Sequence, residues 1–525
     1  MPRAKKTKSS FSYDKDGRAI LGSVKEMAAW VKLGFEEQDR RRMPEDPFQQ
    51  NIIDLSNCVL FVSYPTGSKN PSSQIFNLCD LAGVVPGIEK IEGDSNFLFE
   101  VKLGIRFDGS ILYGNFFHYV KFDGMLSMDG VTILGLCSCF KCHFEEYAYM
   151  QKIHLEGGIT FEQCEFSKGL IMSGSEVGGI SAQFNNSIFR ENLKLASANF
   201  ANSRIKDYTQ VIEFSGSSIE NLNISKIKTD EIPMFFKDTS IKGMKMNNVR
   251  IDGPLDFESC VLDGIVTSVK DEGRENNLIK ELSLHCCDIK AQYHIESSNI
   301  KKFVFSFGKI GESGRIRFSQ CKIEEFLFGS SSVFGQLDII ENKITALDME
   351  GSCVMGNLLF LGNEVVDYSD RQTVRLLKNE ALKINDEVSA VHLYAKEMRL
   401  LLADKSVSRS DKATLLLNNV FSSFGEKWFR AVWVTLLLSV GLTILMLGFG
   451  SSKYMFDPAS EIIGLKPFVT ILLDSINVFS IPLFSDTIKE YQLNVFGQLL
   501  YFLIKLVVTY GSYQFVMAFR KYGKR

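Results

Sequence analysis

Four side chains that can bind a transition metal lie close together in the segment CSCFKCH. Cys137, Cys139, Cys142 and His143 offer three thiolates and an imidazole, which are ligands that zinc prefers. The segment also has a structural interpretation, because Cys139-x-x-Cys142-x-Phe144 follows a spacing that recurs along much of the chain. No second cluster lies at the spacing of a zinc finger. Core packing of these cysteines is therefore the favoured prediction, and a metal site is the alternative.

A second set of chemically capable residues lies in the apolar C-terminal part of the chain. Lys505 stands near the middle of the apolar stretch 495–519, where an ammonium costs at least ~2.5 kcal/mol on insertion scales. Such a lysine is expected to line an aqueous path, to pair with Asp474, or to extend along its own stem to the membrane surface. Gln498 and Gln514 are further polar candidates for the same path.

The sequence carries no signature of an enzyme. It has no phosphate-binding glycine loop, no HExxH motif and no GxSxG motif, and its six histidines are scattered. We therefore predict a protein without catalytic residues and without a cofactor. The net charge of −3, from 59 basic and 62 acidic residues, gives no basis for predicting a nucleic-acid partner.

The segment that holds the cysteines repeats with a period of five residues. Apolar residues recur at Ile323, Phe328 and Val333, and after one extra residue the spacing resumes at Ile339 and Ile344. Neither a helix, with its period of 3.6, nor a strand, with its period of 2, produces this pattern. A chain that turns a corner every five residues, and completes a coil in about 21, does produce it. The apolar series continues to Val354 and Val365. A second inward position lies two residues before each member of this series, and small or polar residues often occupy it: Cys321, Ser331, Asn342, Ser352 and Asn363.

The repeat resembles a known family. The segments LDFESCVLDG, LDIIENKI and LDMEGSCV resemble degenerate pentapeptide repeats of bacterial type, A(D/N)LXX. The resemblance implies a mainly β fold, a right-handed quadrilateral β-helix, over residues 50–366. Polar runs at 202–210 and 267–278 are expected to form loops at its corners.

The segments on either side of the repeat have their own character. Residues 1–48 form a basic N-terminal segment with a short helix, which the capping-box pair Ser23 and Glu26 is expected to begin. Residues 370–428 show amphipathic helical spacing, and a second helix is expected to run through 412–432. This region is predicted to be a helical cap on the last coil, a connector that transmits conformational change, or both. Its candidate connector residues are Glu426, Trp428 and Arg430.

The C-terminal domain, 429–525, is predicted to be α-helical and to lie in a membrane. Residues 431–452 carry no charge, and 495–519 carry only Lys505, so each is long and apolar enough to span a bilayer. Between them, 467–484 is apolar but short, which favours a re-entrant or interfacial segment. The layout of span, short apolar segment and span is similar to that of two-helix channels, although the TVGYG filter motif is absent. A channel of this kind requires a homo-oligomer, and the layout suggests four subunits.

Charge and cysteine usage predict the location of the domains. Basic residues flank both spans on the same side, at Lys427, Arg430 and 520–525, so both chain ends are expected in the cytoplasm and the protein in the inner membrane. Eleven cysteines without paired spacing, and no signal peptide, agree with a reducing compartment.

Two functions fit these features. The first is an oligomeric, channel-like protein whose cytoplasmic β-helix binds a protein or small-molecule ligand, in the setting of a defence or growth-arrest effector. The second is a membrane-anchored β-helix scaffold for protein–protein interaction without transport.

Overall fold

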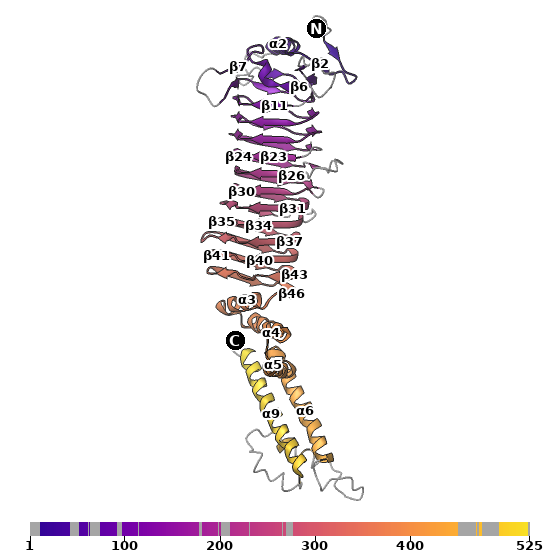
Figure 1. Ribbon diagram of the computed structural model, residues 1–525, viewed down its shortest axis with the longest axis vertical. Helices are drawn as coiled ribbons and strands as arrows, with labels where there is room; N and C mark the ends of the chain where they lie inside the picture. Colours follow the sequence, from indigo (N-terminus) through magenta and orange to yellow (C-terminus); the bar gives the residue numbers. More distant parts are fainter. Residues whose placement is uncertain are drawn as a thin grey trace. The chain divides into compact units, whose positions relative to one another are not determined.

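The computed structural model describes most of the chain, and the statements below concern these residues: 11–41, 52–60, 62–63, 74–91, 97–113, 115–177, 181–197, 199–200, 211–229, 232–264, 266–268, 277–449, 469, 472–474 and 493–522. The chain divides into two compact units, Met1–Asp367 and Tyr368–Arg525. The first is a parallel β-solenoid and the second is helical (Figure 1).

Each coil of the solenoid contributes four short strands that pair in parallel with the same strands of the next coil. One coil consists of β14 (Thr132–Ile133), β15 (Cys137–Phe140), β16 (His143–Phe144) and β17 (Ala148–Tyr149). These pair with β18 (His154–Leu155), β19 (Ile159–Glu162), β20 (Glu165–Phe166) and β21 (Gly169–Ser173). The described strands complete about 11 such turns. The mainly β solenoid that the five-residue period predicts is therefore confirmed.

Later coils merge two neighbouring faces into one long strand. The strands β31 (Arg250–Glu258), β34 (Asn277–His285), β37 (Ser298–Ser306) and β40 (Lys322–Gly329) follow one another in register. The register shifts between Ile251 and Pro254, at the corner between the two faces. Equivalent residues are 22 positions apart at His154 and Glu176, and 21 apart at Cys321 and Asn342, close to the predicted coil length.

Phenylalanine rings fill the interior in continuous stacks. The rings of Phe122, Phe144, Phe166 and Phe189 follow one another at 4.8, 4.6 and 4.9 Å and are nearly parallel. Those of Phe184, Phe214, Phe236 and Phe257 do the same at 4.7, 4.6 and 4.6 Å. These spacings equal the distance between neighbouring strands. The ladder of backbone hydrogen bonds therefore sets the stacking distance of the rings.

The second inward position forms a column of hydrogen bonds, which we call the corner ladder. Asn342 is 1 % exposed, accepts a hydrogen bond from the Cys321 amide at 2.8 Å and donates one to the Phe318 carbonyl at 3.0 Å. Ser187 has the same role, since it accepts from the Cys164 amide and donates to the Phe161 carbonyl. Each such side chain satisfies polar backbone groups of neighbouring coils inside the core.

Two loop and boundary features differ from expectation. Residues 266–268 form β33 (Val266–Ser268) and β34 begins at Asn277, so strand pairing extends into both ends of the predicted loop 267–278. Residues 269–276 and the predicted loop 202–210 lie outside the described part of the chain. At the N-terminal end, β2 (Ala19–Leu21) pairs in parallel with β4 (Cys58–Leu60), which the sequence pattern does not reveal. The helix α2 (Val24–Arg41) follows, and its expected capping box is present, with the Gly22 amide donating to Glu26 and the Glu26 amide to Ser23.

The predicted inward residues of the repeat are buried until the last coil. Ile323, Phe328, Val333, Ile339 and Ile344 are at most 1 % exposed. The equivalent residues in β44 (Cys353–Val354) and β46 (Glu364–Tyr368) are only half-buried, since the last coil has a neighbouring coil on one side only.

The helical unit contains α3 (Arg371–Lys383), α4 (Glu387–Ala403), α5 (Arg409–Ser422), η3 (Ser423–Gly425), α6 (Trp428–Phe449) and α9 (Val495–Tyr522). Asp386 and Ser408 cap the N-termini of α4 and α5 through hydrogen bonds to the amides of Ser389 and Asp411. The single helix predicted for 412–432 is wrong, because α5 ends at Ser422 and α6 begins at Trp428.

We predict that the corner ladder contributes more to solenoid stability than surface ion pairs do. Asn342→Ala leaves the Cys321 amide and the Phe318 carbonyl without that partner in the core, so the local opening free energy should fall by about 2–4 kcal/mol. Hydrogen exchange of the amides of 321–361 in the full-length protein measures this loss. Lys343→Ala removes an exposed side chain that pairs with Glu364 at 3.1 Å, and should change the same exchange by about 0.5 kcal/mol at most. Equal effects of the two variants would contradict the role of the ladder.

Candidate functional site

Two long apolar helices, α6 and α9, pack side by side in the helical unit (Figure 1). Both are long and apolar enough to cross a membrane by length and composition. They approach closely at Gly511, where an added Cβ would lie 1.8 Å from Thr435 Oγ1. Only glycine fits here without displacing the Thr435 side chain of α6.

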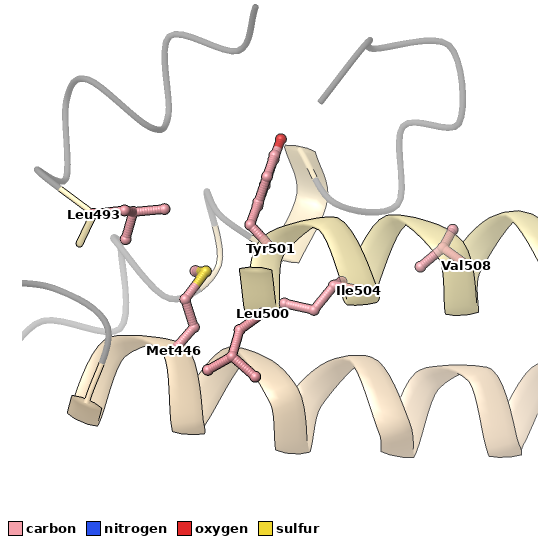
Figure 2. Close-up of a cluster of buried hydrophobic side chains, with 6 residues drawn as sticks. All are labelled: Met446, Leu493, Leu500, Tyr501, Ile504 and Val508. Carbon is pink, nitrogen blue, oxygen red and sulfur yellow. The ribbon is translucent and has the colours of Figure 1, made fainter. Parts of the chain in front are cut away.

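A cluster of buried side chains joins the C-terminal end of α6 to the N-terminal half of α9. It contains Met446 of α6 together with Leu493, Leu500, Tyr501, Ile504 and Val508. Figure 2 shows Leu500 between the two helices and Tyr501 pointing away from α6. The hydroxyl of Tyr501 is directed toward Asp474.

Lys505 lies in a polar cluster with Asp474 and Tyr501, which we call the tail polar cluster. The Tyr501 hydroxyl donates a hydrogen bond to Asp474 Oδ2 at 2.6 Å, and Lys505 Nζ donates one to the backbone carbonyl oxygen of Asp474. Lys505 Nζ also lies 5.6 Å from the centre of the Tyr501 ring. Lys505 is 5 % exposed and Tyr501 is fully buried. Of the environments considered for Lys505, the structure places it against Asp474, through the backbone carbonyl.

Only part of the predicted re-entrant segment 467–484 belongs to the described residues. Val469 and Leu472–Asp474 are helical, and the rest of the segment lies outside the described part of the chain. Asp474 contacts α9 at Tyr501 and Lys505, which are one helical turn apart.

The two predicted glutamines form hydrogen bonds with other elements. Gln498 Nε2 donates to the Leu493 carbonyl at 3.1 Å, at the start of α9. Gln514 is 8 % exposed and its Oε1 accepts a hydrogen bond from Ser422 Oγ at 3.1 Å. The structure therefore brings neither glutamine into the tail polar cluster through a hydrogen bond.

A tight turn at Ser422–Lys427, the connector turn, separates α5 from α6. Ser423, Phe424 and Gly425 all have left-handed backbone angles, with φ of 48°, 59° and 91°. Ser422 Oγ accepts a hydrogen bond from the Gly425 amide at 3.0 Å, which fixes the turn. Non-glycine residues adopt this conformation at a cost that surrounding contacts must offset.

The three predicted connector residues each tie this turn to a different partner. Glu426 accepts hydrogen bonds from Arg399 and, at 2.8 Å, from His392 Nδ1, both on α4. Arg430 Nη1 donates to Ser423 Oγ at 2.8 Å. Trp428 makes edge-to-face contacts at 5.9 and 6.2 Å with two rings of α9, those of Phe515 and Phe519. These residues thus connect the connector turn to α4 and to α9, and Arg430 adds a hydrogen bond within the connection between α5 and α6.

A buried carboxylate, Glu397 of α4, binds three cations of α3. Its oxygens lie 2.6 Å from Lys378 Nζ, 3.0 Å from Arg375 Nε and 3.5 Å from Arg371 Nε, and its side chain is 3 % exposed. Burial alone would raise the pKa of this carboxyl, but the hydrogen bonds from Lys378 and Arg375 outweigh burial and lower the pKa. Glu397 therefore joins α4 to α3 through ion pairs.

The three cysteines of the segment CSCFKCH lie in the core of the solenoid, whereas its histidine lies beside two glutamates. Cys137, Cys139 and Cys142 are at most 1 % exposed, and burial raises the pKa of the Cys139 and Cys142 thiols. Cys142 Sγ donates to the Phe117 carbonyl at 2.9 Å, as a member of the corner ladder. His143 instead lies 3.0 Å from Glu145 and 3.2 Å from Glu165. Within the described residues, no group of three or more His, Cys, Asp or Glu side chains could hold a metal ion.

Sequence reasoning missed Tyr501, Glu397 and His392. A tyrosine one turn before a lysine in an apolar helix is a signal that could have revealed the partner of Asp474. The partners of Glu397 and Glu426 lie on neighbouring helices, and no spacing within one segment indicates such contacts.

We predict a pH-dependent contribution of Glu397 to the helical unit. Because its pKa is lower in the folded state than the ordinary value of 4.5, its stabilisation is fully present above that value and is lost as the pH falls through the lowered pKa. Glu397→Gln leaves three cations facing one another and should cost about 3 kcal/mol at pH 7. Hydrogen exchange of α3 and α4 in the intact protein measures the difference between wild type and variant. A difference that persists unchanged at pH 3 would show that the charge is not its source.

Comparisons with protein-family models, with curated proteins and with solved structures give no match. The resemblance to pentapeptide repeats therefore rests on the sequence pattern, while the solenoid and the two apolar helices rest on the structure.

Proposed function

We propose that this chain is a membrane-anchored β-solenoid protein whose tail forms a channel-like, homo-oligomeric membrane domain. The observation that carries the proposal is the tail polar cluster of Asp474, Tyr501 and Lys505. Lys505 lies ten residues after Val495, which is ~15 Å along the helix axis, about half the thickness of a bilayer core. A charged and hydrogen-bonded group at this depth is expected to serve a transport path.

The position of Asp474 supports a re-entrant segment. Since Asp474 bonds α9 at Tyr501 and Lys505, Asp474 lies beside the apolar stretch 495–519 of that helix, well inside its ends. Backbone that is not part of a continuous span is tolerated at this depth only when protein or water surrounds it. Two spans and a segment that returns into the membrane cannot enclose a path alone, so several copies must assemble around it.

The solenoid is the proposed sensing part. Its stacked, hydrogen-bonded coils form a rigid cytoplasmic surface for a protein or small-molecule ligand, and it performs no catalysis in this account. The connector turn, with Glu426, Trp428 and Arg430, links the helices that follow the solenoid to both apolar helices. A growth-arrest or defence effector that depolarises the inner membrane is the biological setting that fits such a protein.

One observation favours the second candidate, a membrane-anchored scaffold without transport. Lys505 is 5 % exposed and hydrogen-bonded within its own chain, so its charge has a local partner. In a scaffold the tail polar cluster would only stabilise the anchor, and replacing α6 and α9 by an unrelated two-span anchor would preserve activity.

The cytoplasmic location of the solenoid can be tested with its own cysteines. Cys286 and Cys353 are exposed, whereas most other cysteines of the solenoid are buried. A membrane-impermeant maleimide should therefore leave both unlabelled in intact cells and label both in inverted vesicles, as peptide mapping can measure. Labelling of Cys353 in intact cells would place the solenoid on the outer side.

The channel can be tested by conductance of the purified full-length protein in a planar bilayer. Lys505→Met should change the size or the ion preference of discrete currents, because it removes the charge from the path. Lys405→Met, which removes an exposed positive charge between α4 and α5, is the matched control and should leave ion preference unchanged.

If the wild type gives no current although the protein is shown to be inserted and oligomeric, the scaffold is favoured. Currents that are identical in wild type and Lys505→Met would place Lys505 away from the path.

A further inference from the structure

A pocket of about 490 Å³ opens where the end of α9 meets α3 and α4. Its volume lies within the roughly 300–1,000 Å³ typical of small-molecule sites. Its walls combine two cationic side chains, Lys378 of α3 and Arg520 of α9, with the apolar or aromatic side chains of Leu382, Val391, Tyr394 and Met517. A pocket with both kinds of lining fits an amphiphilic anion.

The charge around the pocket is positive. Lys378 shares the carboxylate of Glu397 with Arg375 and Arg371, so one negative charge faces three positive ones. Arg520 is exposed and forms no ion pair with a residue that the structure describes. Glu387 is the carboxylate that lines the pocket itself. The surplus of positive charge is available to an anionic ligand.

Apolar side chains next to the pocket indicate contact with a lipid surface. Leu382, Ile384 and Val388, at the turn between α3 and α4, are 51 %, 46 % and 42 % exposed. Three large apolar side chains in one short turn are unusual on a surface that faces water alone. Arg520 closes the apolar stretch of α9, so the pocket opens at the level where that helix would leave the bilayer.

We propose that this pocket binds an anionic phospholipid of the surrounding membrane, with its phosphate between Lys378 and Arg520 and an acyl chain along Leu382, Val391 and Met517. This inference rests on the proposed membrane location of α6 and α9, but it requires neither a channel nor an oligomer. Bound lipid would join α3 and α4 to the end of α9, and α4 contacts the connector turn through the bonds of His392 and Arg399 to Glu426. The lipid composition of the membrane would thereby act on the connector.

The test is native mass spectrometry of the full-length protein in detergent, with phosphatidylglycerol, phosphatidylcholine or inorganic phosphate added. The wild type should retain phosphatidylglycerol in preference to phosphatidylcholine. Arg520→Gln should weaken that retention about fivefold, the effect of one cation near an anionic lipid. Lys412→Gln, which removes a half-buried cation of α5, is the control and should retain as much lipid as the wild type. Arg520 is exposed, so its loss should leave hydrogen exchange of α3 and α4 unchanged.

Three results would overturn the proposal. Equal retention of both lipids would remove the role of the anionic headgroup. Equal losses in Arg520→Gln and Lys412→Gln would show that the lipid binds elsewhere. Displacement of phosphatidylglycerol by millimolar inorganic phosphate, with phosphate bound in its place, would make the site one for a free anion.

The proposed membrane location is tested separately by carbonate extraction of cell membranes. Extraction of the protein would contradict the membrane anchor itself. Retention in the membrane together with equal binding of both lipids would contradict only the lipid pocket.

Discussion

The solenoid depends on the hydrogen bonds of the corner ladder, because a coil that turns every five residues points backbone groups into its own core. A small polar side chain at a corner solves this problem by accepting from an amide and donating to a carbonyl of the preceding coil, as Asn342 and Ser187 do. The residue before each of these, Glu341 and Asn186, has a left-handed backbone that turns the chain. The phenylalanine stacks then fill the remaining interior at the strand spacing of 4.6–4.9 Å.

The need to pair backbone groups inside the core also explains why cysteines recur at the inward positions. A thiol can donate to a carbonyl of the preceding coil as a hydroxyl or an amide does, and Cys142, Cys164 and Cys260 occupy the ladder position in this way. Three thiols and a histidine within seven residues therefore arise from the solenoid pattern, without a requirement for zinc. The residue types in CSCFKCH fit both cases, and it is the match of Cys139 and Cys142 to the recurring spacing of the repeat that favours the core.

The solenoid could be predicted from the sequence because its period is local: Ile323, Phe328 and Val333 lie on successive faces of one coil, so that their spacing reveals the turn. What depends on contacts between distant segments could not be predicted. The pairing of β2 with β4 joins residues across an intervening helix. The break between α5 and α6 depends on three left-handed residues, only one of which is glycine. At the candidate site, Lys505 and Asp474 were named from their chemistry, whereas the role of Tyr501 required the fold.

The two apolar helices obey the same rule of satisfied polar groups, because the polar groups between them and Asp474 bond one another. Tyr501 and Lys505 both bond Asp474, and Figure 2 shows Tyr501 pointing away from α6. The most direct measurement of the central claim is a cryo-electron microscopy structure of the full-length protein in a lipid nanodisc. The account predicts several copies around one axis, with Asp474 beside Lys505 at bilayer depth. A single copy, with 467–484 lying on the membrane surface, would contradict it.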